Sequence, residues 1–366
     1  MLSLRQVVQD TFGVSDLSQG LRQTLWAPLY QRAPNLYPFQ DPQHRQSIYQ
    51  TLLHWDTWPT SNDFTQETTY PDDKRTPYSS ENLQGVGHTE TFWVFNREDR
   101  TLIFWPVNQD LDGSLSFYYP SQPSASQLPT DYDHYGDCGG RYIPETNQWL
   151  IVIAVEGEGV DNCICFHTFD DPGISQPNQA SASFLGYWVI NDGPQVSQDS
   201  NAPWAAFDRI QKQFYSSRFN ETSFYQVYSY DNELSGNQIV MPTIVYEGQV
   251  ELKTHAGTTI QLNRVQGGSV SQNNRLYLSV DRHEDEGGGV YGFDLVTGKQ
   301  MLYLPSDGDR FNREIEGLTI WNVDTFNPPN VSGQVHLTVL DNFNLTPNEQ
   351  IFIRHWSANA NVVDHL

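Results

Sequence analysis

RVQGGSVSQNNRLYLSVDRHEDEGGGVYGFDLVTGKQ, residues 264–300, predicts two short strands, Arg275–Asp281 and Gly289–Leu295, joined by an acidic, glycine-rich loop. The strand residues alternate or are β-branched and aromatic, and Gly, Asn and Asp mark the boundaries, a pattern typical of antiparallel hairpins. A run of small residues, QGGS at 266–269, precedes the first strand. This order of a polar residue, small residues and then strands recurs along the chain, and the recurrence predicts the fold.

The same plan occurs five times between residues 82 and 357, with openings 50 to 66 residues apart. Each opening joins a polar or otherwise distinctive residue to one or two small ones: Gln84-Gly85, Cys138-Gly139-Gly140, Trp204-Ala205-Ala206, Gln266-Gly267-Gly268 and Glu316-Gly317. Hydrophobic strands and turns follow each opening. Four of the five units also contain a candidate fourth strand, at Leu115–Tyr119, Phe184–Ile190, Gln238–Tyr246 and Met301–Leu304. Self-similarity at such a spacing is the mark of repeated supersecondary units.

Four antiparallel strands repeated around an axis predict an all-β protein with a β-propeller fold, and the count of openings predicts five blades. A sixth, degenerate blade hidden in a long connection is one alternative to this count. A β-sandwich with irregular loops is the alternative architecture. The fifth unit has no fourth strand of its own. Propellers often close the ring with a strand from the N-terminal side, so we expect the segment just before Gln84 to supply it.

The first 80 residues differ in pattern from the rest. Apolar residues at helical spacing form two runs, residues 4–12 and 17–29, and a further helix is expected near Gln43–His54. A polar, proline-containing stretch follows and reads as an extended connector. The sequence therefore predicts a helical N-terminal extension and connector over residues 1–80, packed on a propeller domain over residues 81–366.

Two stretches, Gln266–Gly298 and Glu316–Trp356, resemble blades of the broad β-propeller superfamily that includes strictosidine-synthase-like, phytase-like and lactonase-like proteins. The likeness covers residues 82–357 at the level of blade pattern. The sequence lacks the Asp-box of sialidases, a tryptophan–aspartate repeat and a kelch signature. The resemblance therefore implies an architecture and assigns no residue a role.

The composition limits the partners of the protein. Its 44 acidic and 20 basic residues give a formal charge of −24, which repels nucleic acid and anionic membranes. The sequence contains no run of about 18 apolar residues, so no membrane-spanning segment is predicted. The N-terminus lacks the apolar region of a signal peptide, which favours a cytoplasmic location and leaves export open. The oligomeric state is left open as well.

Three cysteines are too few for a disulfide scaffold. Cys163 and Cys165 flank one residue of a predicted strand, so both side chains should point to one face. Cys138 could pair with one of them in an exported protein. Free, buried thiols are the favoured state, because cysteine is often a core residue.

In a propeller the innermost strand of each blade lines the central channel. The residue before the small one is then expected to face that channel, and these residues are Gln84, Cys138, Trp204, Gln266 and Glu316. Neighbours on the same strands or on the loops before them are His88, His134, Asp137, Arg264 and Glu314. Polar groups beside an aromatic ring in a concave place predict a small-molecule site. The alternative is a structural network of paired polar groups and trapped water.

Glu316 is the leading candidate for a catalytic residue. A carboxyl in a partly dry channel has a raised proton affinity and can act as a general acid or base, with His88 or His134 as its proton-transfer partner. Asp137 is the second candidate carboxylate. Trp204 is expected to stack on a substrate, and Gln84, Gln266, Arg264 and Cys138 are expected to contact it. The alternative for Glu316 is a salt bridge to Arg264 or Arg313.

No motif demands a cofactor. The loop after the strand at Arg275–Asp281 offers Asp281, Glu284 and Asp285 as oxygen ligands, for which Ca²⁺ is the natural cation. The loop lacks the spacing of an EF-hand, so a solvated hairpin tip is the favoured alternative.

These observations predict an enzyme that acts on a small organic molecule by acid–base chemistry in the central channel, as a hydrolase or a lyase or cyclase. A non-catalytic carbohydrate- or peptide-binding propeller is one alternative. A five-bladed glycoside hydrolase is another, and it would need two carboxylates facing each other, for which Asp137 and Glu316 are the candidate pair.

Overall fold

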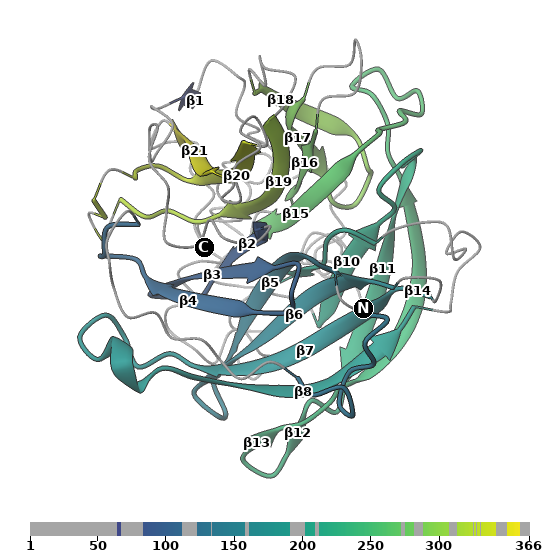
Figure 1. Ribbon diagram of the computed structural model, residues 1–366. Coiled ribbons are helices and arrows are strands. Elements are labelled where there is room, and N and C mark those ends of the chain that lie inside the picture. The colour runs from purple at the N-terminus through teal and green to yellow at the C-terminus, as the bar shows by residue number, and fades with distance from the viewer. Residues whose placement is uncertain are drawn as a thin grey trace, which may run out of the picture.

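The computed structural model describes residues 64–66, 83–111, 123–132, 134–157, 161–190, 202–208, 212–271, 275–281, 288–306, 313–324, 326, 328–329, 331–341 and 350–358. Within them, five antiparallel sheets stand around a common axis (Figure 1). The prediction of an all-β, five-bladed propeller is confirmed.

Each blade begins with a strand beside the axis and ends at the periphery. The first blade contains β2 (Leu83–His88), β3 (Phe92–Arg97) and β4 (Leu102–Pro106). The second contains β5 (His134–Ile143), β6 (Gln148–Glu156), β7 (Cys163–Asp170) and β8 (Ser181–Val189). The third contains β9 (Ala206–Asp208), β10 (Gln213–Ser217), β11 (Phe224–Asp231) and β14 (Thr243–Glu251), with a small hairpin of β12 (Leu234–Ser235) and β13 (Gln238–Ile239) between the last two. The fourth contains β15 (Val265–Ser271), β16 (Arg275–Val280), β17 (Gly289–Asp294) and β18 (Gln300–Pro305).

The fifth blade closes the ring. Its own strands are β19 (Arg313–Ile320), β20 (Val335–Asp341) and β21 (Gln350–Ala358), and β1 (Phe64–Gln66) adds an outer strand from the N-terminal side. β1 runs antiparallel to β21, with Thr65 opposite Ser357. The predicted closing strand is confirmed, and the blade that lacked a fourth strand in sequence receives one from the other end of the chain.

Five apolar clusters among the described residues fill the gaps between neighbouring blades. Successive side chains of β3 show why: Phe92 and Val94 pack toward the second blade, and Trp93 and Phe95 pack toward the fifth. Side chains on a strand alternate between its faces, so a strand covered on both sides is apolar throughout. This double burial explains the unbroken hydrophobic runs that the sequence places inside each blade.

The predicted outer strands agree with the structure in two blades. Phe184–Ile190 falls within and just beyond β8, and Met301–Leu304 lies inside β18. Gln238–Tyr246 is placed too early, because the β12–β13 hairpin takes its first residues and β14 begins at Thr243. Leu115–Tyr119, and the helices expected before residue 60, lie outside the described residues.

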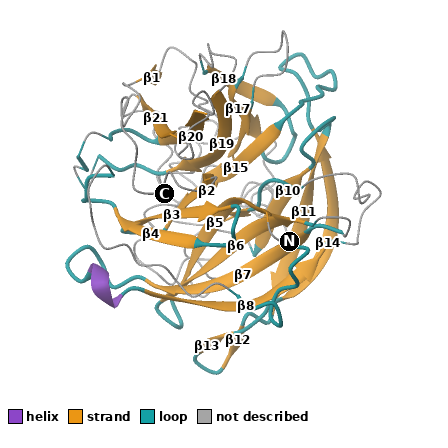
Figure 2. Cartoon of the chain, viewed as in Figure 1, coloured by secondary structure: helices purple, strands orange, loops and turns teal. Residues whose placement is uncertain are grey.

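Strands make up nearly all regular structure in the described part of the chain, which holds one short 3₁₀ helix at Pro177–Gln179 (Figure 2). None of its helices has the length and apolarity needed to cross a membrane. Cys138, Cys163 and Cys165 are free and buried, as expected. Cys163 and Cys165 both pack in the cluster between the first and second blades, which confirms that they share one face of β7.

Candidate functional site

Four of the five inner strands carry a β-bulge at the same level of the channel. In each bulge two residues lie opposite one residue of the next strand, as register shifts in β2, β5, β15 and β19 show. The bulged pairs are Gln84–Gly85, Gly136–Asp137, Gln266–Gly267 and Glu316–Gly317. A bulge bends the strand and re-aims its side chains, which suits strands that converge on an axis.

The second blade departs from the predicted alignment. Cys138-Gly139-Gly140 imitates the Gln266-Gly267-Gly268 pattern, but the bulge lies two residues earlier, at Gly136–Asp137. Cys138 is therefore not the first residue of the bulge, and Asp137 stands where the other three bulges have glycine. The prediction of Cys138 as a channel residue equivalent to Gln266 is corrected by this register.

Asp137 is the point at which the blades meet. Its Oδ1 accepts a hydrogen bond from the Val86 N–H at 2.8 Å, and its Oδ2 accepts bonds from the Gly268 and Leu318 N–H groups at 3.0 Å each. Its own N–H donates to the Pro203 carbonyl oxygen at 2.6 Å, just before the third blade. Asp137 thus bonds to the inner strands of three other blades and to the segment that leads into the third blade.

The three glycines of the other bulges surround this carboxylate. A Cβ added at Gly267 would lie 2.6 Å from Asp137 Oδ2, and one at Gly317 would lie 2.5 Å from Asp137 Oδ1. At Gly85 it would lie 2.7 Å from the Asp137 Cα. The small residues of the repeat are therefore required by crowding at the axis, and the single larger side chain fills the space they leave.

Asp137 is too deeply buried to belong to an open substrate-binding site. It is 0% exposed, and burial raises its pKa to about 8 against the opposing effect of the backbone N–H donors of Leu318, Val86, Cys138 and Gly268. Both oxygens already accept backbone hydrogen bonds. Asp137 therefore divides the channel into a start rim, where the inner strands begin, and a far rim, where they finish.

Glu316 lies on the start-rim side of Asp137. It is 2% exposed, and no residue in the described part of the chain makes a hydrogen bond or ion pair with its carboxyl. Burial raises its pKa well above the ordinary value, the charges of Glu314, Asp281 and Glu156 raise it further, and Arg264 opposes the rise. Its surroundings therefore favour the protonated form of the Glu316 carboxyl and keep its pKa well above the ordinary range.

Arg264 ties two other acidic groups together at the same rim. Its Nη2 lies 2.7 Å from Glu314 Oε1 and 2.8 Å from Asp281 Oδ2. Gln266 Nε2 also donates to Glu314 Oε1, at 3.2 Å, and Asp281 Oδ1 accepts the Ile315 N–H at 3.1 Å. Predicted binding residues Arg264 and Gln266 therefore lie beside Glu316 and hold its acidic neighbours in place.

His134 belongs to this rim as well. Its Nδ1 lies 3.3 Å from Glu98 Oε1, and it stands opposite Glu156 across the β5–β6 pair. Burial raises the pKa of Glu156, the His134 charge lowers it, and Glu98 raises it. The Glu156 charge in turn raises the pKa of Glu316. His134 therefore influences Glu316 indirectly, through its effect on Glu156.

His88 lies on the other side of Asp137, at the far rim. It is four residues beyond Gln84, the counterpart of Glu316, which is about 13 Å along a strand. Its Nδ1 bonds to the Thr89 carbonyl oxygen at 2.6 Å, and its ring stacks on Trp321 with centroids 4.6 Å apart. The structure thus does not bring the predicted Glu316–His88 pair together.

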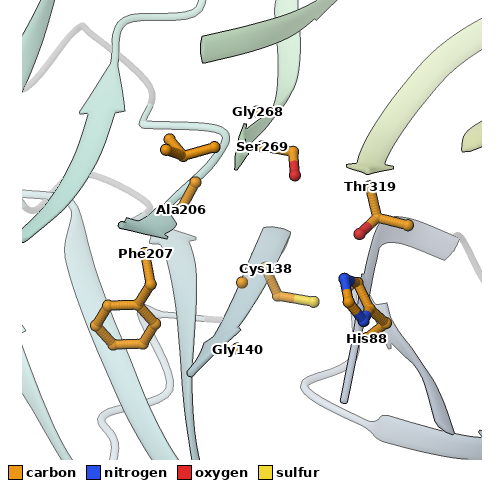
Figure 3. A pocket seen from close by; sticks show the side chains of 11 residues that line it. His88, Cys138, Gly140, Ala206, Phe207, Gly268, Ser269 and Thr319 are labelled. Carbon is orange, nitrogen blue, oxygen red and sulfur yellow. The ribbon is translucent and has the colours of Figure 1, made fainter. Parts of the chain in front are cut away.

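A small cavity at the far rim is lined by His88, Cys138 and Thr319 among other residues (Figure 3). Its volume is about 20 Å³, room for one water molecule. Ligand pockets for small molecules measure roughly 300–1,000 Å³. Burial and the nearby Asp137 charge raise the pKa of the Cys138 thiol well above its usual value, and the cavity that Cys138 lines has no room for a substrate.

Trp204 is a core residue between the third and fourth blades. It is fully buried, its Nε1–H donates to Ser217 Oγ at 2.8 Å, and its ring lies directly against Gly268. The predicted stacking on a substrate does not fit this position, because both ring faces are covered by protein. Gln84 occupies the first position of its bulge, half-buried, as predicted for the channel.

The candidate calcium ligands are only partly described. Asp281 is already engaged by Arg264 and the Ile315 N–H, and Glu284 and Asp285 lie outside the described residues. Within the residues that are described, no group of three or more His, Cys, Asp and Glu side chains could hold a metal ion. Calcium binding stays a prediction.

Sequence reasoning missed Glu156. It ends β6, the second strand of its blade, whereas the blade pattern directs attention to the inner strands and the loops before them. The signal that could have found it is the β5–β6 hairpin: once His134 is placed at the start of β5, Glu156 must lie opposite.

No protein-family model matches the chain, and no curated protein sequence matches it. Among solved structures, it is similar to a GH43_1 enzyme from Xanthomonas citri (10% identity, TM-score 0.43, covering 75% of this chain and 87% of that one). It is also similar to an α-L-arabinanase from Cellvibrio cellulosa (11% identity, TM-score 0.41, 80% and 100%) and to Sqt1 from Saccharomyces cerevisiae (12% identity, TM-score 0.33, 74% and 60%). Similarity at this level adds nothing to the arrangement of strands described above. The strictosidine-synthase-like, phytase-like and lactonase-like resemblance stays one of blade pattern.

Proposed function

We propose that the protein is a glycoside hydrolase whose active site lies at the start rim, with Glu316 as the general acid. The observation that supports this most is the contrast between two kinds of carboxyl in one place. Glu316 is buried, without a hydrogen-bond partner in the described part of the chain, and has a raised pKa, whereas Glu314 is salt-bridged to Arg264 and 29% exposed. Hydrolysis of a glycosidic bond needs such a pair, one carboxyl protonated and one ionised.

The proposed reaction assigns each group one task. Glu316 donates its proton to the leaving-group oxygen as the bond from that oxygen to the anomeric carbon breaks. Glu314 takes a proton from the water that attacks the same carbon, so the two carboxyls exchange charge and solvent restores them. Arg264 and Gln266 hold Glu314 in place through its Oε1. Asp281 is the poorer choice for this base, because Arg264 and the Ile315 N–H engage both of its oxygens.

The test compares Glu316→Gln with the unmodified protein on a panel of aryl pentosides and hexosides. Each sugar carries either 4-nitrophenol, the poorer leaving group of the two, or 2,4-dinitrophenol, the better one. Loss of a general acid costs roughly 10²–10⁴-fold in rate, and it matters least when the leaving group needs no proton. We therefore expect a large loss on 4-nitrophenyl glycosides, a small loss on dinitrophenyl glycosides and an unchanged thermal midpoint.

Glu145→Gln is the matched control, because Glu145 is an exposed glutamate in the β5–β6 turn at the far rim. It should leave both rates unchanged. The proposal fails if the unmodified protein hydrolyses no member of the panel, or if Glu316→Gln slows both leaving groups equally. A protein that retains the sugars on an affinity column but never cleaves them would be a carbohydrate-binding propeller instead.

A further inference from the structure

We infer that Asp137 is the positioning residue of the start-rim site: its carboxylate fixes the Glu316 bulge against the inner strands of two other blades and takes no part in proton transfer. This inference rests on the proposed function for what Glu316 does. It differs from the sequence-based expectation, in which Asp137 and Glu316 were the facing catalytic pair.

The first support is the spacing of the three N–H groups that Asp137 receives. Each comes two residues after the first residue of a bulge: Val86 after Gln84, Gly268 after Gln266, and Leu318 after Glu316. The carboxylate thus bonds to the same backbone position in three blades. Whatever fixes these positions also fixes the side chains that the bulges present to the start rim.

The second support is that the backbone around Glu316 is held on every side. The Ile315 N–H donates to Asp281 Oδ1 at 3.1 Å, and the Glu316 carbonyl accepts from Ser279 Oγ at 2.7 Å. The Gly317 carbonyl accepts from Thr338 Oγ1 at 3.2 Å, and the Leu318 N–H completes the set by donating to Asp137. The bond to Asp137 is the member of this set that comes from across the axis.

The third support is that Asp137 lacks what a catalytic carboxylate needs. It has no exposed surface, and Gly85, Gly267 and Gly317 leave no room for a substrate atom beside it. A group in this setting stabilises geometry and does not shuttle protons.

The experiment uses Asp137→Asn, which keeps the shape but replaces one oxygen by a donor. Asp171→Asn is the matched control: Asp171 accepts four hydrogen bonds, from Thr89 Oγ1, the Thr91 N–H and Oγ1, and the Gly173 N–H, at the far rim between the first two blades. Both variants should lower the thermal midpoint. Only Asp137→Asn should slow 4-nitrophenyl glycosides at least tenfold while changing dinitrophenyl glycosides less than threefold, with KM unchanged.

Azide separates positioning from catalysis, because a small anion can replace a missing catalytic carboxylate but not a backbone clamp. We expect azide to raise the rate of Glu314→Ala and to leave Asp137→Asn unchanged. Rescue of Asp137→Asn by azide would make Asp137 catalytic and overturn the inference. So would a rate loss in Asp137→Asn that is equal for both leaving groups.

A measurement without catalysis keeps the inference open to failure even if no glycoside is cleaved or the variant does not fold. In the unmodified protein, the amide resonances of Val86, Gly268 and Leu318 should shift together in a pH titration, with one common midpoint near pH 8, because one carboxylate serves all three. Three unrelated midpoints, or no shift, would overturn the inference. Failure of the proposed function alone would show as inactivity with this common titration intact.

Discussion

Replacing Gly317 by alanine tests the crowding at the axis that the fold and the site share. The new Cβ would lie 2.5 Å from Asp137 Oδ1 and slightly closer still to the Val86 nitrogen. Real Cβ atoms do not approach other heavy atoms so closely. Overpacking of this kind costs about 1–3 kcal/mol. The Cβ would also displace the carboxylate from Val86 or Leu318, and a hydrogen bond to a charged group contributes about 1.5–3 kcal/mol.

We therefore expect Gly317→Ala to lower the free energy of unfolding by about 2.5–6 kcal/mol, read from urea unfolding followed by tryptophan fluorescence. Two controls separate the causes. Gly139→Ala, on the same kind of inner strand, meets its nearest neighbours at 3.1 Å and should cost about 1 kcal/mol or less. Gly257→Ala has open space but a φ of +90°, so it measures backbone strain alone, about 1–2 kcal/mol. A cost for Gly317→Ala within about 1 kcal/mol of Gly139→Ala would refute the reasoning.

Three further predictions concern charge and closure. Arg264→Gln removes a positive charge that lowers the pKa of Glu316, so the alkaline limb of the activity profile should move to higher pH. The folded pKa of Asp137, about 8, is above its ordinary 3.8, so its stabilising contribution is full below about pH 4 and is lost as pH rises through 8. Urea midpoints at pH 5, 7 and 9 should accordingly fall more steeply in the unmodified protein than in Asp137→Asn, and equal slopes would contradict the raised pKa. Thr65→Pro removes a backbone donor from the three-residue strand β1, opposite Ser357, and should speed proteolytic cleavage before residue 83 at least several-fold; an unchanged cleavage rate would mean that β1 does not hold the ring closed.

The fold could be predicted because its signals are local. Short stretches of sequence contain all of these signals: alternation within each strand, turns between strands and a recurring small-residue opening. The predicted units correspond in the structure to β15–β18 and the matching strands of the other blades. Ring closure could be predicted as well, since the fifth unit visibly lacked an outer strand. The start of β14 could not, because the inserted hairpin β12–β13 uses strand-like residues of its own.

The site was harder to predict because its key residue depends on all five blades at once. Asp137 replaces a glycine of the repeat, and only the packing of Gly85, Gly267 and Gly317 around it explains why one blade breaks the pattern. The pattern of small residues therefore assigns Cys138 to the first position of the bulge, which Gly136 occupies in the structure. The two histidines likewise belong to opposite rims. His134 begins its strand at the start rim, whereas His88 lies four residues beyond Gln84 and therefore far from Glu316.

Burial raises the pKa of Glu316 well above its ordinary value, and its proposed role as the general acid requires this raised pKa. The most direct measurement is a ¹³C NMR titration of the glutamate carboxyl carbons, with Glu316 assigned by the signal that disappears in Glu316→Gln. We expect the Glu316 carboxyl to titrate with a midpoint well above the ordinary 4.5. A Glu316 signal that titrates at or below 4.5 would contradict it.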